Sequence, residues 1–275
     1  MAAPEILGAI AGAEFTVKII VCLKQVPSRE AVLRLDAAGT WIQDSDISFE
    51  VNEPDIFALE EALRLKEKHG GEVIVCSLGP ARAQQAIKEA LAKGADRALH
   101  LDDPSFGGLD PRGTAKGLAA AIRGENPDLV LTGLQSDDSG SAQTGVILAQ
   151  LLGVPHATII MEIQVEGARL KVTRELEGGW FQWIEMPLPA LLTIQSGINK
   201  PRYASLKGIL AAKNKPLKKL TAAELGLSAA DIAPRQKIAK VYVPAKKGQT
   251  EFLGGSPKEM ATQLVDKLKN EARVL

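Results

Sequence analysis

The sequence predicts an α/β fold in which helices cover both faces of a mainly parallel sheet, extended by an antiparallel hairpin and a C-terminal arm that ends in a helix. Three patterns support this prediction. Short apolar runs typical of doubly covered strands alternate with amphipathic segments of helical length up to about residue 152. Period-two stretches follow Pro155, and a proline-bearing segment with few periodic apolar positions follows Lys213. Crossovers of helical length join parallel strands, so the sheet is expected to be doubly wound.

Length, charge balance and cysteine content limit the size of the domain, the kinds of partner and the cellular compartment. The chain has 275 residues, 45% of them hydrophobic, which suits one large domain with appendages. Its 33 basic and 33 acidic residues balance, which argues against nucleic acid or a membrane surface as partner. No apolar run reaches the roughly 18 residues of a membrane span. Cys22 and Cys76 lie in apolar strand-like runs, which predicts reduced, buried thiols and favours the bacterial cytoplasm or an organelle matrix.

The first β-α unit is expected to begin at residue 17. Residues 17–23 form an apolar run rich in β-branched side chains, and Pro27 stops regular structure soon afterwards. Residues 33–49 alternate around a turn signal, which predicts a small hairpin. A helix is then expected to open at Asn52 and to end at Gly70.

The unit then recurs along the chain. The next expected elements are a strand at 72–77, a helix ending at Gly94, a strand at 97–101, a helix at 114–123 and a strand at 128–132. The carboxyl ends of three strands fall at Leu23, Ser77 and Thr132. Ligands of doubly wound sheets bind beyond that edge, so a binding site is expected there.

The loop from Gly133 to Thr144 is the main candidate for binding chemistry, because it joins an expected strand to an expected helix. Glycines and hydroxyl side chains dominate it and its border, namely Gly133, Gly140, Gly145, Ser139, Ser141 and Thr144. The glycines are expected to let a ligand approach the backbone, and the free N–H groups of a helix N-terminus attract anions. The pattern favours a nucleotide phosphate, although the same residue types also form exposed loops and helix caps.

Catalytic and metal-binding motifs do not accompany this loop. It matches neither G-x-x-x-x-G-K-[ST] nor G-x-G-x-x-G. Asp137 and Asp138 are interpreted as caps or as ligands of a ribose or a water. The three histidines are far apart, and no C-x-x-C and no Ser-His-Asp grouping in a nucleophile-elbow context occurs. The sequence therefore predicts no catalytic residue and no metal site.

After Pro155 the sheet is expected to gain a hairpin from residues 157–165 and 169–176, and then a strand at 190–194. Trp180, Phe181 and Trp183 lie between these elements; packing in the core or hairpin is the default expectation, and contact with a partner is the alternative. Residues 195–220 hold seven basic and no acidic side chains, either a solvated face or a surface for an acidic partner.

Three regions are expected in total. They are an N-terminal extension at 1–16, a nucleotide-binding α/β domain at 17–212, and an extended arm with a terminal helix at 213–275. In that helix Met260, Leu264, Val265 and Leu268 form an apolar stripe with lysines around it. Such a stripe needs a covering surface, on this chain or on a partner.

Several stretches together resemble the β subunit of electron transfer flavoprotein over nearly the whole chain from Val17. They are Leu23–Pro27, Ala58–Lys66, Ser77–Pro80, Ala90–Arg97, Gly133–Gly145, Val172–Gly179 and Asn199–Tyr203. The stretch Val-x-Arg-Glu-x-x-Gly-Gly at 172–179 is similar to the signature region of that family. The resemblance implies an adenine-nucleotide α-hydrolase-like fold and an electron-carrier subunit that changes no bond itself.

The resemblance also implies a heterodimer. A larger α subunit carries the redox FAD, and the crevice of the β subunit holds AMP, or a second FAD in electron-bifurcating members; AMP is favoured. By position, the nucleotide contacts fall on Cys22, Asn52, Glu53, Pro54, Asp55, Leu78, Gly133, Leu134, Gln135, Ser136, Asp137, Asp138, Ser139, Gly140, Ser141, Ala142, Gln143 and Thr144. Cys22 and Leu78 are expected to contribute backbone contacts.

The resemblance implies partners as well. A loop with an apolar tip docks acyl-CoA dehydrogenases, and by alignment it is formed by Gln195, Ser196, Gly197, Ile198, Asn199 and Lys200, with Ile198 as an exposed anchor. Electrons then pass to a quinone oxidoreductase or another acceptor, and the C-terminal helix packs on the α subunit. The alternatives are a stand-alone nucleotide-binding sensor or hydrolase of universal-stress-like type, and an assembly subunit with an empty crevice.

Overall fold

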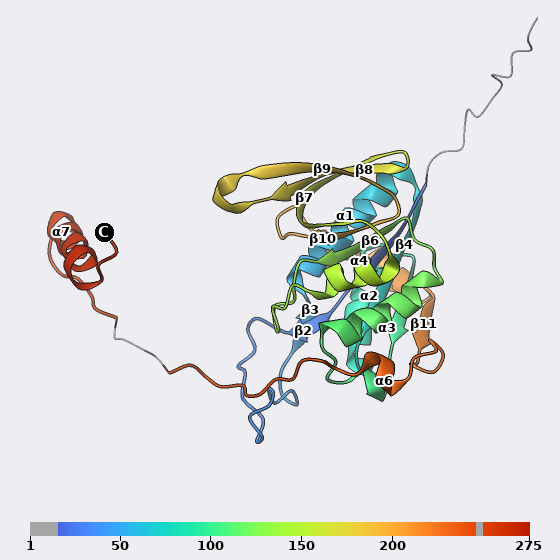
Figure 1. The fold of residues 1–275 in the computed structure, drawn as a ribbon, viewed down its shortest axis with the longest axis horizontal. Coiled ribbons are helices and arrows are strands. Elements are labelled where there is room, and N and C mark those ends of the chain that lie inside the picture. The colour runs from blue at the N-terminus through green and yellow to red at the C-terminus, as the bar shows by residue number, and fades with distance from the viewer. Residues whose placement is uncertain (1–15, 246–249) are drawn as a thin grey trace, which may run out of the picture. The chain divides into compact units, whose positions relative to one another are not determined.

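The computed structural model describes residues 16–245 and 250–275. The chain divides into a larger compact unit, residues up to Arg34 together with Gln43–Ile238, and a smaller unit formed by Leu35–Ile42 and Ala239–Leu275 (Figure 1). Apart from Thr16, the expected N-terminal extension lies outside the described residues.

Nine strands of the larger unit form one sheet in the order β11-β5-β4-β1-β6-β10-β7-β8-β9 (Figure 1). Neighbours from β11 to β7 are parallel, and β7, β8 and β9 are antiparallel. The strands are β1 Val17–Cys22, β4 Gly71–Leu78, β5 Arg97–Leu101, β6 Leu129–Gly133, β7 His156–Glu166, β8 Arg169–Glu175, β9 Phe181–Pro187, β10 Ala190–Ile194 and β11 Leu217–Leu220. The predicted mainly parallel sheet with a hairpin extension is confirmed.

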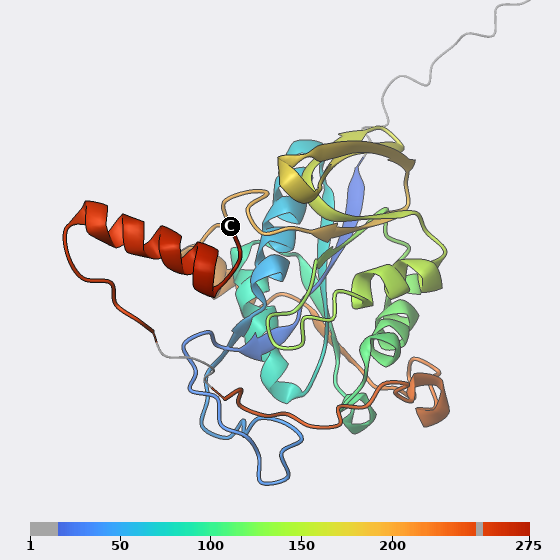
Figure 2. The same ribbon diagram turned by 60° about the vertical axis from the view of Figure 1, so that its left-hand side comes forward.

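Helices cover both faces of this sheet. They are α1 Glu53–His69, α2 Gln84–Lys93, α3 Pro111–Arg123, α4 Thr144–Leu152, α5 Leu206–Ala212 and α6 Ala229–Ile232, with short 3-10 turns at Ala81–Ala83, Pro104–Phe106 and Glu177–Gly179. Residues of α1 and α2 share one apolar cluster with the sheet, and residues of α3 and α4 share the other. Figure 2 shows the light-blue helix α1 and the green helices α3 and α4 on opposite sides of the strands. The fold is therefore doubly wound, as expected.

Local sequence explains the bounds of α1, the helix that begins at the strand ends. Pro54 fits the first turn, where a helix needs no amide donor, and Glu53 and Asp55 lie at the positive end of the helix dipole. Basic side chains occupy the last turn, and Gly70 ends the helix with a φ of 73°. These signals set the two ends of α1.

The region expected to form a small hairpin at 33–49 has little strand structure. A single bridge joins Leu35 to Ile42, and the Asp36 carboxylate accepts bonds from the N–H groups of Thr40 and Trp41. These N–H groups are bonded to a side chain and so do not form the backbone hydrogen bonds between strands that a hairpin requires. The antiparallel pair that does form is shorter and joins β2 Gln25–Pro27 to β3 Phe49–Val51.

The larger unit extends past the boundary expected at residue 212. Strand β11 pairs with β5, and the Ile232 side chain of α6 is buried in the cluster that contains α3. The carboxylate of Asp110 accepts the backbone N–H groups of Arg235 and Gln236. Residues 213–238 therefore cover strand β5. Without them the backbone N–H and C=O groups along the outer edge of β5 would be exposed.

The aromatic residues of the hairpin lie outside the core, and Trp183 packs within the hairpin, where the Lys171 ammonium lies 4.9 Å from the centre of its ring. Trp180 is 74% exposed, and Phe181 and Trp183 are also exposed on and beside the edge strand β9. Alternation along β9 directs Met186 into the core and leaves the aromatic side chains outside it. Contact with a partner, the alternative interpretation of these residues, stays a prediction.

The smaller unit contains the helix α7 Pro257–Asp266, which continues as a π-helical turn at Lys267–Glu271. Ser256 and Glu259 form a reciprocal capping box at its start. Leu264 and Val265 of its apolar stripe are about half exposed, while Met260 and Leu268 are partly buried. Among the helices of the described residues, none combines the length and apolar character that crossing a membrane requires.

Candidate functional site

The predicted nucleotide residues converge on one edge of the sheet. Strand β1 lies between β4 and β6, so the strand ends at Cys22, Leu78 and Gly133 are neighbours. The N-terminus of α1, residues 52–55, meets the same edge through a hydrogen bond to Gly133. We call this set, with the loop 133–144, the strand-end site.

The buried carboxylate of Asp55 joins three segments of the strand-end site. One oxygen accepts the backbone N–H of Lys24 at 2.7 Å, and the other accepts the N–H of Gly133 at 2.9 Å. Burial raises the pKa of Asp55 from its usual 3.8 to about 7, against the opposing effect of the hydrogen bonds from Lys24, Asn52 and Gly133. The Asp55 side chain therefore links segments within the protein.

Two of the three loop glycines are required by packing, which corrects the expectation that all three admit a ligand. A Cβ on Gly133 would overlap the Asp55 carboxylate and lie 2.7 Å from Cβ of Pro54. A Cβ on Gly145 would lie 2.7 Å from side-chain atoms of Thr132 and Thr193. Gly140 is different, because its φ of 58° favours glycine and no atom lies within 4 Å of the Cβ position.

The first part of the loop is fixed by side chains from two other segments. Asn52 donates to the carbonyl of Gln135 and accepts from the N–H of Asp137, both at 2.9 Å. The Lys24 ammonium lies 2.6 Å from the Asp138 carboxylate and donates to Ser136 at 3.2 Å. Residues 135–138 are therefore held in place without a ligand.

Both loop aspartates have cationic partners. Arg29 pairs with Glu53 and lies 3.5 Å from the Asp137 carboxylate. Burial works to raise the pKa of Asp138, but the Lys24 ammonium and the loop hydrogen bonds outweigh it and hold that pKa below its usual value. Of the roles considered from sequence, anchoring of the loop is the one that these contacts support.

The second part of the loop offers donors to an anion. The first backbone bond across the start of α4 runs from Ile147 N–H to Gln143 C=O, so the N–H groups of residues 144–146 have no intrahelical partner. Gln143 supplies no side-chain cap. Ser141 and Thr144 are half-buried beside these groups, and Ser139 bonds to Ser136 at 2.8 Å. These residues fit a phosphate by the chemistry of their donors.

Lys24 was missed among the candidate site residues. Its ammonium group contacts Ser136 and Asp138 of the loop, and its backbone N–H donates to Asp55. The signal was available, because Lys24 is the first charged residue beyond the carboxyl end of β1. Its long-range partners Ser136 and Asp138 were not visible in the local pattern.

The thiols at this edge are free and buried, as expected. Burial raises the pKa of Cys22 well above its usual value and that of Cys76 to about 12. Both side chains are therefore protonated near neutral pH and unsuited to nucleophilic chemistry, which leaves the backbone of Cys22 as its possible contribution to a ligand.

The expected exposed anchor, Ile198, is instead half-buried and packed against the core. Its neighbour Asn199 donates to the Phe57 carbonyl and to the Glu61 carboxylate, each at 3.0 Å, which fixes the loop 195–200 on α1. The expectation of an exposed Ile198 is wrong, because the contacts of Asn199 with α1 hold the loop against the protein and Ile198 packs on the core.

The exposed apolar residues of this region follow the loop. Tyr203 is 96% and Leu206 75% exposed, and Ile209 and Leu210 are about half exposed. We call these four side chains the 203–210 apolar surface. The exposed Lys200, Lys207 and Lys213 lie in the same segment. The helical spacing of residues 206, 209 and 210 after the capping Ser205 was the sequence signal for it.

Comparison with known proteins gives consistent results. Residues 40–225 match the electron transfer flavoprotein domain family. The chain is 39% identical over 255 residues to an electron transfer flavoprotein subunit beta of Methylophilus methylotrophus, covering 90% of this chain and 96% of that protein. It is 38% identical over 260 residues to subunit CarD of the caffeyl-CoA reductase-Etf complex of Acetobacterium woodii, covering 92% and 98%. It is 37% identical over 262 residues to a mitochondrial electron transfer flavoprotein subunit beta of Oryza sativa, covering 94% and 100%.

The link through Asp55 predicts a pH-dependent loss of stability on substitution. Asp55→Asn should lower the free energy of unfolding by about 1 to 3 kcal/mol, because the amide replaces one acceptor by an NH2 group that faces a backbone N–H. The raised pKa means that the folded state binds the proton more tightly than the unfolded state, so the contribution of Asp55 falls as the pH rises from about 4 to about 7.

Urea unfolding of both proteins across that pH range measures this effect. The stability difference between wild type and Asp55→Asn should shrink with rising pH, since the variant lacks the titrating group. A difference that does not change with pH would contradict the raised pKa.

Proposed function

The chain belongs to the family of electron transfer flavoprotein β subunits, and from this premise we propose that it binds an adenine nucleotide at the strand-end site within a heterodimeric electron carrier. It is a carrier subunit and not a catalytic enzyme in its own right. The larger α subunit is its partner. FAD supplies the redox chemistry when bound to the complex, and the residues of this chain bind, orient and position.

The observation that supports the nucleotide most strongly is the start of α4. Its N–H groups at 144–146 have no intrahelical partner. They follow a loop whose first half is fixed by hydrogen bonds from Asn52 and Lys24. Electrostatics at a helix N-terminus favour a phosphate there. The adenosine part would then contact backbone groups at Cys22 and Leu78 and the segment Asn52–Asp55, which lie at the same edge of the sheet.

AMP is the nucleotide we propose, with a second FAD as the bifurcating alternative. We propose an acyl-CoA dehydrogenase-type donor, and a quinone oxidoreductase or another acceptor. The name of the Acetobacterium relative, which belongs to a caffeyl-CoA reductase complex, is in keeping with a coenzyme A thioester partner. The relatives come from bacteria and from a mitochondrion, so we propose the cytoplasm or organelle matrix as its compartment.

The apolar stripe of α7 is proposed to pack on the α subunit, because about half of the Leu264 and Val265 side chains is exposed and gains by burial against a partner. The donor is proposed to dock on the region that begins at the loop 195–200 and continues into the 203–210 apolar surface. Leu206 and Tyr203 are the side chains free to enter a partner pocket, and the lysines around them suit an acidic rim on the donor.

The nucleotide proposal predicts what the complex releases on denaturation. Chromatography of the heterodimer purified with its α subunit should yield about one AMP for each FAD. Two FAD and no AMP would assign the bifurcating alternative. No nucleotide would leave only an assembly role, and ATP consumption by the chain alone would favour a hydrolase.

A matched pair of variants ties that nucleotide to the loop. Ser141→Asp places a negative charge beside the phosphate donors and should reduce the AMP content by about tenfold in complex diluted below saturation. Ser45→Asp adds the same charge at an exposed serine outside the strand-end site and should retain AMP. Equal nucleotide content in the two variants would argue against phosphate binding at this loop.

The docking proposal predicts a loss of donor affinity in Leu206→Ala. Removing a side chain that becomes buried loses about 1.5 to 3 kcal/mol, so the KM for the donor should rise about 10- to 100-fold. Val32→Ala, which alters another exposed aliphatic side chain of the larger unit, is the control. Donor-dependent flavin reduction measures both, with flavin content unchanged; an unaltered KM in Leu206→Ala would remove this surface from the proposal.

A further inference from the structure

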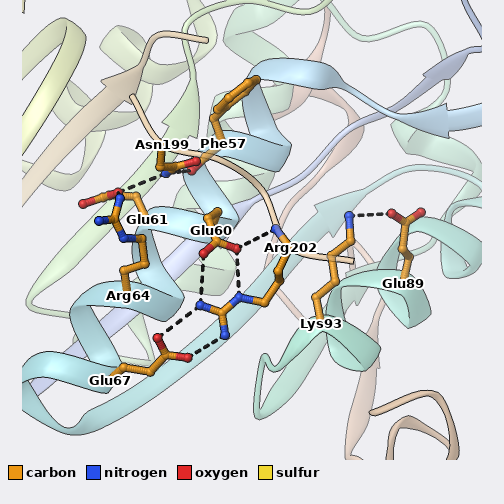
Figure 3. A network of polar contacts seen from close by, with 9 residues as sticks. All are labelled: Phe57, Glu60, Glu61, Arg64, Glu67, Glu89, Lys93, Asn199 and Arg202. Atoms are coloured by element: carbon orange, nitrogen blue, oxygen red, sulfur yellow. Dashed lines mark hydrogen bonds and ion pairs between the residues drawn. The ribbon is translucent and has the colours of Figure 1, made fainter. Parts of the chain in front are cut away.

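Arg202 is bound by two glutamates of α1 immediately before the 203–210 apolar surface (Figure 3). Its Nε donates to Oε2 of Glu60 at 2.9 Å, and one Nη donates to Oε1 of Glu60 at 3.0 Å. The Nη atoms also reach both oxygens of Glu67, at 2.5 and 3.1 Å. The backbone N–H of Arg202 donates to Glu60 as well, at 3.0 Å. We call these contacts the Arg202 clamp.

The clamp is strong because its central carboxylate is buried. Glu60 is 6% exposed, and a buried carboxylate without a partner is costly, so Arg202 must keep its position for the fold to tolerate Glu60. Bidentate contacts to both glutamates also fix the plane of the guanidinium group. The hydrogen bond from Arg202 is the largest influence that lowers the pKa of Glu67. Side chain and backbone of residue 202 are thus fixed together.

The downstream end of the segment is fixed to a different helix. A Cβ on Gly208 would overlap the carbonyl of Ala92 at the end of α2, so α5 lies directly against that helix. Lys215 donates to the carbonyls of Leu91 and Ala95, at 2.9 and 2.6 Å. Between the clamp and these contacts the chain presents Tyr203 and the apolar side chains of α5 outward.

Fixing the segment 203–212 at both ends should favour docking of a partner on it. An exposed apolar side chain gains by turning inward, and a seven-residue helix has little stability of its own. A segment fixed at both ends is already ordered in its exposed conformation. Binding then does not have to order the segment, and the loss of conformational entropy on association is smaller.

We propose that Arg202 is a positioning residue for donor docking, which holds the 203–210 apolar surface ready to bind through its contacts with Glu60 and Glu67. This inference rests on the proposed docking function. It assigns to Arg202 an effect on donor affinity that passes through the order of the surface, since its guanidinium group is engaged by the two glutamates.

The chain contains a matched control for this residue. Arg97 also binds two glutamates, through Nε and Nη contacts to Glu72 and Glu125 at 2.5 to 3.1 Å. The two arginine side chains have similar exposure, 33% for Arg202 and 26% for Arg97. Those contacts of Arg97 involve no residue of the segment 199–212. Arg→Lys at either position keeps the charge and removes the bidentate geometry.

The experiment compares Arg202→Lys and Arg97→Lys in the complex with the α subunit and FAD. Hydrogen exchange of the amides of residues 203–212 measures the order of the surface without any donor. Donor titrations of flavin reduction give KM and kcat. We expect faster exchange and a KM raised about five- to tenfold in Arg202→Lys only, with kcat at saturating donor unchanged. Glu67→Gln, which removes the more exposed partner, should shift both readouts in the same direction by less.

Other results would overturn the inference. Faster exchange with an unchanged KM would show that order of the surface does not affect docking, and unchanged exchange would show that the clamp does not order it. Equal KM changes in the two arginine variants would indicate general destabilisation. Failure of the docking proposal itself is a separate result, because Leu206→Ala would then leave KM unaltered whatever the exchange data show.

Discussion

The hydrogen bonds of buried Asp55 are the constraint on which the strand-end site depends. One carboxylate at the start of α1 holds the backbone beyond β1 and the backbone at the end of β6. Three segments distant in sequence are thereby brought to fixed positions at one edge of the sheet. Gly133 follows from this constraint, because a side chain there would displace the carboxylate. The loop that continues from Gly133 inherits its starting direction from the same contact.

Under the proposed function, some residues of the loop 133–144 hold its structure and others bind the nucleotide. Its carboxylates and the Asn52 amide satisfy partners within the protein, so the negative charges nearest the ligand region are paired with Lys24 and Arg29. The groups left for a ligand are backbone N–H groups and hydroxyls at the start of α4. Such groups bind and orient an anion without supplying an acid, a base or a nucleophile. This division suits a carrier subunit whose contribution is positioning.

Sequence patterns predicted the parallel core well, because a strand that is buried on both faces is a short run of apolar residues that can be recognised in the sequence. The runs at β1, β4, β5, β6 and β10 are short and mainly apolar, and they form neighbouring strands. Strand β11 could not be predicted from its sequence, because two of its four residues are lysines. Its position in the sheet depends on pairing with the distant strand β5. Asn199 and Arg202 form their contacts with residues more than a hundred positions earlier in the chain. The exposed Ile198 that the resemblance implied is therefore half-buried, because contacts with residues distant in sequence hold its loop on α1.

Photolabelling of the heterodimer with an azido analogue of AMP, followed by peptide mapping, tests most directly whether a nucleotide binds at the strand-end site. A nucleotide at the strand-end site should place label on peptides that contain residues 133–144 or 52–55, and excess AMP should remove that label. Label confined to other peptides, or label that AMP does not displace, would contradict a nucleotide at the strand-end site.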